Sequence, residues 1–170
     1  RDVWFAYNPG EWVLQGVSFH VYPKQTVAFV GATGSGKSTI LSLICRNYDI
    51  QKGQILIDGV DIRDVSQHEL REKIGFVPQK GVLFSGTIKS NLRYSRENAP
   101  DDELQKAAQI AQAADFIEDK EAGYDSEIAQ GGGNVSGGQK QRLSIARALV
   151  KRAPIYIFDD SFSALDFKTD

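Results

Sequence analysis

The feature that most constrains this chain is the segment Gly31–Ser38, which reads G-A-T-G-S-G-K-S. It matches the pattern G-x-x-x-x-G-K-[ST], whose glycines let several backbone N–H groups turn toward one anion. An apolar, β-rich run at 26–30 precedes the segment, and Ile40 and Ile44 after it lie on one side of a helical pattern. A strand, a glycine loop and a helix in this order predict a phosphate-binding loop.

Each residue type in this loop has a chemical task. The helix N-terminus adds positive potential, the Lys37 ammonium neutralises β- and γ-phosphate oxygens, and the Ser38 hydroxyl is a ligand for Mg²⁺. The predicted ligands are therefore ATP and Mg²⁺, and the alternative is a glycine-rich turn with a solvated lysine. The nucleotide-binding residues predicted here are Gly31, Thr33, Gly34, Ser35, Gly36, Lys37, Ser38 and Thr39.

The rest of the chain mixes strand and helix patterns. The run 55–62 reads as a strand, an Asp-Gly turn and a second strand, which predicts an antiparallel hairpin. One helical pattern begins after Pro100 with acidic residues in its first turn, and another begins near Ser136, where S-G-G-Q fits a capping box. We predict an α/β fold: a P-loop NTPase core with a mainly parallel sheet, an antiparallel β subdomain, and a helical insert at about 85–150.

Two acidic residues follow the apolar run 155–158, which we interpret as a central parallel strand because it is apolar on both faces. A magnesium ion in a P-loop fold needs a carboxylate at the end of a buried strand, and Asp159 fits that position. Asp160 comes next. The alternative for either residue is that it caps the turn that follows.

Composition excludes several classes of function. A net charge of −2 gives no electrostatic footprint for a nucleic-acid backbone, so no nucleic-acid partner is expected. With 41% apolar and 25% charged residues, the 170-residue chain is typical of one globular domain, and no apolar run has the roughly 18 residues of a membrane helix. The single cysteine, Cys45, is interpreted as helix core in a reducing environment.

Several segments, in order along nearly the whole chain, resemble the ABC ATPase family. The deciding one is Val135–Arg142, V-S-G-G-Q-K-Q-R, which resembles the family signature L-S-G-G-Q with Val in place of Leu. The residues F-V-P-Q that end at Gln79 resemble the Q-loop, the run 155–159 resembles Walker B, and Ser163–Asp166 resembles the D-loop. The resemblance implies an ABC ATP-binding domain over residues 1–170.

The resemblance also implies roles for single residues. Tyr7 lies where the family places an aromatic ring on adenine, although ordinary strand packing is the alternative. Gln79 is expected to reach the Mg²⁺ or the attacking water and to link the nucleotide to a membrane domain; the alternative is a polar loop residue. In the family the signature acts on a second domain's ATP, so that two domains pair head to tail. The signature residues expected to contact nucleotide are Ser136, Gly137, Gly138 and Gln139.

The stretch Val82–Ile88, followed by Asn91 and Leu92, resembles exporter-type members more than importer subunits. This implies a motor that binds and hydrolyses ATP at the cytoplasmic face of the cell membrane, with a transmembrane domain and a second nucleotide-binding domain as partners. One alternative is a soluble ABC ATPase in DNA repair or on the ribosome, but neither a long coiled-coil insertion nor a tandem second domain appears. The other alternative is a regulatory partner that binds ATP without hydrolysing it.

The chain departs from the family pattern in three ways. Asp160 stands where the family carries a catalytic Glu, and a displacement of about 1 Å can cost roughly 100-fold in rate. This resembles the weak-site half of a heterodimeric exporter, with Asp160 and Gln79 as catalytic candidates. Gln130 stands where exporters usually carry Glu. The chain stops at Asp170, before the family's switch histidine, so we expect a domain truncated at its C-terminus; the alternative is a domain that lacks those functions.

Overall fold

The computed structural model describes residues 1–161, so the predicted D-loop at Ser163–Asp166 lies outside the described residues. The chain divides into two compact units, Arg1–Glu72 and Lys73–Asp170, and each is described by itself. The first unit carries the predicted phosphate loop. The second carries the predicted Q-loop, signature and Walker B residues.

The first unit is built on an antiparallel pair of strands and one helix. Strand β1 (Val3–Ala6) pairs with β2 (Trp12–Val17), and helix α1 (Lys37–Ile44) follows the phosphate loop. The buried core consists of Val3, Phe5, Leu14 and Leu43. The unit thus packs the phosphate-loop helix and the first two strands around one apolar cluster.

The predicted hairpin at 55–62 is confirmed, because β3 (Leu56–Ile57) pairs antiparallel with β4 (Val60–Asp61). The two residues between the strands, Asp58 and Gly59, have φ angles of 52° and 81°. Positive φ at both central residues is the mark of the turn that Asp-Gly favours in two-residue hairpins. The short helix α2 (Gln67–Glu72) ends the unit.

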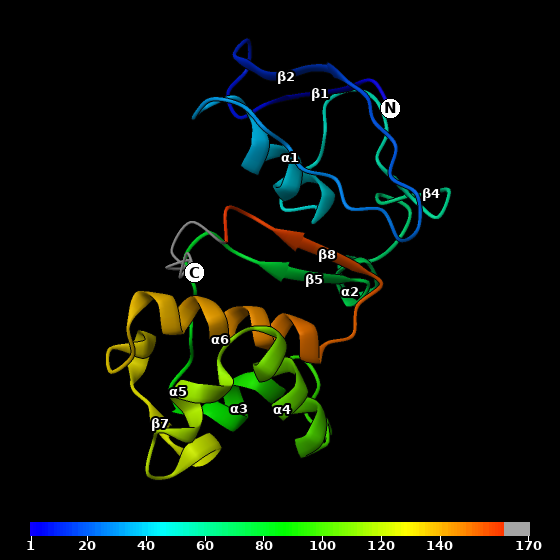
Figure 1. Ribbon diagram of the computed structural model, residues 1–170. Coiled ribbons are helices and arrows are strands. Elements are labelled where there is room, and N and C mark those ends of the chain that lie inside the picture. The colour runs from blue at the N-terminus through cyan, green and yellow to red at the C-terminus, as the bar shows by residue number, and fades with distance from the viewer. Residues whose placement is uncertain (162–170) are drawn as a thin grey trace. The chain divides into compact units, whose positions relative to one another are not determined.

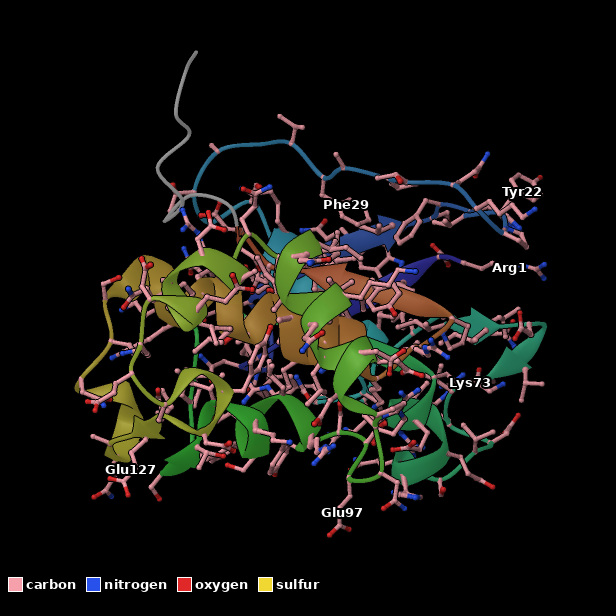
Figure 2. The ribbon with its side chains drawn as sticks, turned by 60° about the horizontal axis from the view of Figure 1, so that its bottom comes forward. Arg1, Tyr22, Phe29, Lys73, Glu97 and Glu127 are labelled. Atoms are coloured by element: carbon pink, nitrogen blue, oxygen red, sulfur yellow. The ribbon has the colours of Figure 1, made fainter. Side chains whose placement is uncertain are left out.

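The prediction of a strand at 26–30 is wrong, because these residues form no regular structure. A strand needs a neighbour to receive its backbone hydrogen bonds, and the segment has no strand partner among the described residues. Val27 and Val30 are accordingly 45% and 94% exposed. Figure 2 shows Tyr22 and Phe29 on this irregular stretch between β2 and α1.

The second unit places a parallel strand pair against a helix layer. Strand β5 (Ile74–Val77) pairs in parallel with β8 (Ile155–Phe158), in the register Ile74 with Ile155. Figure 1 shows the long helix α6 (Gly137–Val150) between this pair and the other helices. Those helices are α3 (Ile88–Arg93), α4 (Asp101–Ile110) and α5 (Ala114–Glu118). The remaining short elements are β6 (Gly86–Thr87), η1 (Gly123–Asp125), β7 (Glu127–Ile128) and η2 (Gln130–Gly132).

Both predicted helices are present. Pro100 is the N-cap of α4, whose first turn holds three acidic residues at the positive end of the helix dipole. The helical pattern after Pro100 continues past the end of α4, but the helix stops at Ile110. There Gln112 adopts a φ of 56°, and the Ala113 N–H donates to the Ala108 carbonyl over 2.7 Å. That is a Schellman-type ending, which satisfies the last carbonyls of the helix.

The prediction of a mainly parallel sheet also differs from the structure. Among residues 1–161 the strands form four two-stranded sheets, and the β5–β8 pair is parallel whereas the other three are antiparallel. A broad parallel sheet needs the run at 26–30 as one of its strands, and that run is unpaired. Tyr156 of β8 is also 38% exposed, so the strand is not buried on both faces.

Candidate functional site

The phosphate loop is held in a shape that only glycine tolerates. Gly34 and Gly36 have φ angles of 82° and 90°, and Gly36 is the N-cap of α1. A Cβ on Gly36 would lie 2.9 Å from Leu14 Cδ2, and a Cβ on Gly31 would lie 2.9 Å from Ser35 Oγ. Any side chain at these positions would therefore fill the curled loop or push it away from β2.

The ammonium of Lys37 lies over this curled loop. Its Nζ donates to the carbonyl oxygens of Gly31 and Ala32 over 2.7 and 2.8 Å, and to Ser35 Oγ over 3.4 Å. Lys37 is also the first residue of α1, where the helix N-terminus leaves backbone N–H groups without intrahelical acceptors. A phosphate at this loop would replace these neutral acceptors with anionic oxygens, so that the ammonium and the phosphate form an ion pair as well as hydrogen bonds.

The chemistry of the loop fits a triphosphate that brings its own metal ion. Magnesium is usually held by one or two protein side chains, with substrate phosphates and water as the other ligands. Ser38 supplies a hydroxyl in the first turn of α1. Within residues 1–161 no cluster of three or more His, Cys, Asp or Glu side chains could hold a metal by itself.

Tyr7 and Thr39 lie together in the first unit. The Tyr7 hydroxyl and Thr39 Oγ1 are 3.1 Å apart and share a hydrogen bond, while the Tyr7 ring stays 50% exposed. Phe5 and Tyr48 contact that ring edge to face, with centroids 4.9 and 5.2 Å away. Sequence reasoning missed Tyr48, because nothing in its neighbourhood indicates that the chain after α1 returns to Tyr7.

Gln79 and Asp160 meet in the second unit, although they are 81 residues apart in sequence. Gln79 Nε2 donates to Asp160 Oδ2 over 3.2 Å, and the Asp159 N–H donates to the Val77 carbonyl over 3.0 Å. Asp160 adopts a φ of 46°, in the left-handed region that short polar side chains tolerate. The parallel pairing of β5 with β8 therefore brings the Q-loop glutamine and the acid after Walker B into contact.

Ser136 caps α6 as the sequence predicts. Ser136 Oγ accepts from the Gln139 N–H over 3.2 Å, and the Ser136 N–H donates to Gln139 Oε1 over 3.0 Å. A Cβ on Gly137 would meet nothing within 4 Å, so the first turn of the helix has open space beside it. The N-terminus of α6 thus presents backbone N–H groups where an anion has room to approach.

Gln141 and Ser161 hold the loop that carries Gln79, and sequence reasoning missed both. Gln141 Nε2 donates to the Pro78 carbonyl over 3.0 Å, and Ser161 Oγ donates to the Val77 carbonyl over 2.9 Å. Both side chains are buried. A polar residue on the buried side of a helix indicates that its side chain is hydrogen-bonded, but the sequence does not indicate which distant group is the partner.

Two other predicted positions have clear surroundings. Cys45 is buried at the end of α1, and burial raises the pKa of its thiol to about 11. A thiol with that pKa stays protonated at neutral pH and is a poor nucleophile, which agrees with its interpretation as helix core. Gln130 begins η2 and is exposed, followed by Gly131 at a φ of 64°.

These features, a glycine-rich loop at a helix N-terminus and a parallel strand followed by two acidic residues, define a P-loop nucleotide-binding protein. The chain matches a family model described as ABC transporter over residues 14–163. It therefore belongs to the ABC transporter family. Within residues 1–161 no helix is long and apolar enough to cross a membrane.

Known relatives include exporters. The chain is 48% identical over 170 residues to an ATP-dependent lipid A-core flippase of Saccharophagus degradans, covering 100% of this chain and 29% of the flippase. It is 46% identical over 170 residues to the beta-(1→2)glucan export ATP-binding/permease protein NdvA of Rhizobium johnstonii, with the same two coverages, 100% and 29%.

A solved structure gives the fold. The structure of a bacterial Atm1-family ABC exporter with ATP bound matches this chain with a TM-score of 0.93 and 47% identity. The match covers 98% of this chain and 29% of that one. The fold is therefore that of an ABC exporter's ATP-binding domain, and the chain spans less than a third of the length of these relatives.

Proposed function

We propose that this chain is the ATP-binding and ATP-hydrolysing motor domain of an ABC exporter, located at the cytoplasmic face of the cell membrane. The observation that carries the proposal is the Lys37 ammonium held over the glycine loop at the N-terminus of α1, with Nζ 2.7 Å from the Gly31 carbonyl. The relatives named as a lipid A-core flippase and a glucan exporter support an export role.

In this proposal the first unit binds the nucleotide. Lys37 turns from the loop carbonyls to the β- and γ-phosphates, and the loop backbone surrounds them. The exposed half of the Tyr7 ring stacks on the adenine. Ser38 is the proposed Mg²⁺ ligand of this unit, and Asp159 and Gln79 are proposed as Mg²⁺ ligands from their resemblance to the family motifs. When bound, the ion neutralises charge that develops on the phosphate oxygens.

Asp160 and Gln79 are the proposed catalytic residues. The Asp160 carboxylate orients the attacking water, and Gln79 contacts the same carboxylate through its amide. Asp160 is one methylene shorter than Glu, and its Oδ2 is already an acceptor for Gln79. Both facts support a slow own site, because a catalytic carboxylate must lie within hydrogen-bond reach of the water.

We propose that Ser136, Gly137, Gly138 and Gln139 complete the ATP site of a second nucleotide-binding domain. The open space beside Gly137 and the N-terminus of a 14-residue helix support this role. The partner is proposed to carry Glu after its Walker B aspartate, so that the pair forms a heterodimer with one slow and one fast site. A transmembrane domain is the other partner.

A regulatory ATP-binding partner that hardly hydrolyses is the second candidate function. The observation that favours it is the engagement of Asp160 Oδ2 by Gln79, which leaves this carboxylate less free to activate water. Turnover of the full-length protein, measured with and without a Glu-bearing partner, separates the two. Turnover that stays at background without the partner, and that disappears in the pair when the partner's glutamate is replaced by glutamine, supports the regulatory role.

The experiment that tests the motor function is ATP hydrolysis in lipid nanodiscs by the full-length pair, with the partner's own glutamate replaced by glutamine so that turnover comes from this chain's site. Lys37→Ala should reduce the rate to background, because the phosphates lose their neutralising cation. Lys24→Ala is the matched control, since Lys24 is an exposed lysine of the same unit, and it should leave the rate unchanged. Equal rates for Lys37→Ala and Lys24→Ala would contradict the proposal.

A further inference from the structure

We propose that Gln141 is a positioning residue that ties helix α6 to the loop carrying Gln79, and so sets the contact between Gln79 and Asp160. The inference rests on the proposed function, because it assigns Gln79 and Asp160 to hydrolysis. Gln141 itself does not reach the reacting groups. It acts through the backbone of the residue before Gln79.

The burial of Gln141 needs an explanation. Its side chain lies on α6 and is 1% exposed, and its Nε2 donates to the Pro78 carbonyl over 3.0 Å. Burying an amide is unfavourable unless it is hydrogen-bonded, and an apolar residue of similar volume fills the same space without that penalty. The amide is therefore better explained by the loop that it holds than by packing.

A second contact fixes the same loop on α6. A Cβ on Gly81 would lie 2.6 Å from the Lys140 carbonyl oxygen and 2.9 Å from the Gln141 nitrogen. The loop backbone thus packs directly on the backbone of α6, with no room for a side chain. Gln79 lies between the two attachment points, Pro78 and Gly81.

The other side of the loop is fixed by the residues after β8. Ser161, which is 0% exposed, donates from Oγ to the Val77 carbonyl over 2.9 Å. Gln79 then reaches Asp160 over 3.2 Å. The Pro78 carbonyl also accepts a longer bond, of 3.5 Å, from Ser161 Oγ. If it loses its shorter bond to Gln141, this weaker contact remains, so the peptide that joins Pro78 to Gln79 is freer to rotate and we expect the Gln79 amide to leave Asp160.

The hydrogen bond from Gln141 to Pro78 links movement of helix α6 to the position of Gln79. Helix α6 begins next to Ser136, the residue proposed to face the ATP of a second domain. Gln141 lies on the same helix and holds the loop of Gln79. A displacement of α6 by a nucleotide at Ser136 is therefore transmitted to Gln79 through one hydrogen bond and one backbone contact.

The test uses the full-length pair, with the partner's own glutamate replaced by glutamine so that turnover comes from this chain's site, and the volume-matched variant Gln141→Met, which cannot donate. We expect kcat for ATP hydrolysis to fall about tenfold, because small misplacements of catalytic groups are costly. The KM for ATP should stay within about twofold, because the phosphate loop is untouched. Ser144→Ala is the matched control: Ser144 lies on the same helix, is 1% exposed, and its Oγ has no hydrogen-bond partner within the described chain.

Combination with Gln79→Ala separates positioning from a purely structural role. If Gln141 acts through Gln79, adding Gln141→Met to Gln79→Ala should change kcat by less than about twofold, since coupled residues are non-additive. Full additivity, or a Gln141→Met variant with wild-type kcat, overturns the inference. If Gln141→Met does not fold, Gln141→Asn keeps the amide but shortens its reach, and should reproduce the loss.

Amide hydrogen exchange of the full-length protein gives a second readout that does not depend on turnover. Peptides that contain residues 77–84 should exchange faster in Gln141→Met than in wild type, and at the wild-type rate in Ser144→Ala. Unchanged exchange in Gln141→Met overturns the inference. Failure of the proposed function looks different: Lys37→Ala would then hydrolyse ATP as well as wild type, whatever residue 141 is.

Discussion

The hydroxyl groups of Tyr7 and Thr39 lie 3.1 Å apart and share a hydrogen bond. Tyr7 follows β1, and Thr39 belongs to the first turn of α1, directly after the phosphate loop. Because Phe5 and Tyr48 also contact the Tyr7 ring edge to face, its plane is fixed relative to the loop. The proposed adenine platform is thus attached to the helix that carries the proposed phosphate ligands.

Tyr7→Ala should weaken binding of ATP by about 1–3 kcal/mol, since the variant loses the stacking surface for the base. Calorimetry with Mg-ATP on the full-length protein measures this directly. Trp12→Ala serves as a control, because Trp12 is also a partly exposed aromatic residue of the first unit. An alanine variant of Tyr7 with wild-type affinity would mean that the ring only packs against Phe5 and Tyr48.

Tyr7→Phe tests the hydrogen bond separately. Stacking alone predicts a nearly silent change, but the bond to Thr39 predicts a loss of about 0.5–1.5 kcal/mol in ATP binding. Thr39→Val should cost a similar amount, and the double variant should cost no more than either alone. Additive losses would show that the two hydroxyls act on the nucleotide independently.

Asp160→Glu should raise kcat at this chain's own site, because the longer side chain restores reach to the attacking water. The affinity for ATP should change little, since the phosphate loop is unaltered. The measurement needs the full-length pair with the partner's own glutamate replaced by glutamine, so that turnover comes from this site. No gain in kcat would mean that more than side-chain length limits the site.

Ser136→Ala should depress hydrolysis by the pair more than Asp160→Asn does. The first change damages the signature that is proposed to complete the partner's fast site, whereas the second damages a site that is already slow. Ser136→Ala also removes the helix cap, which costs about 1 kcal/mol of stability, so thermal unfolding should be measured beside it. The reverse order of rates contradicts the proposed division of labour.

The sequence predicted local features well because their signals are local. The Asp58-Gly59 turn and the N-cap at Ser136 depend on residues close together in the chain. The contacts between distant segments were not predictable in the same way. Periodicity shows that Gln141 lies on a helix, but only the packing of the loop at Pro78 shows what its amide binds.

The strand predicted at 26–30 failed for a related reason. An apolar, β-branched run has the composition of a strand, yet strand formation depends on a neighbour that supplies backbone partners. Among the described residues no strand pairs with this run, and Val30 is 94% exposed. Composition alone could not predict that absence.

The central claim is that the loop at Gly31–Ser38 binds the triphosphate of ATP through Lys37. The most direct test is calorimetric titration of the full-length protein and its Lys37→Ala variant with Mg-ATP, with Lys24→Ala as the control. The account predicts tight binding to wild type and control, and a loss of at least about 100-fold in affinity for Lys37→Ala, because the charge-assisted bonds to the phosphates disappear. Equal affinity of wild type and Lys37→Ala for Mg-ATP would contradict it.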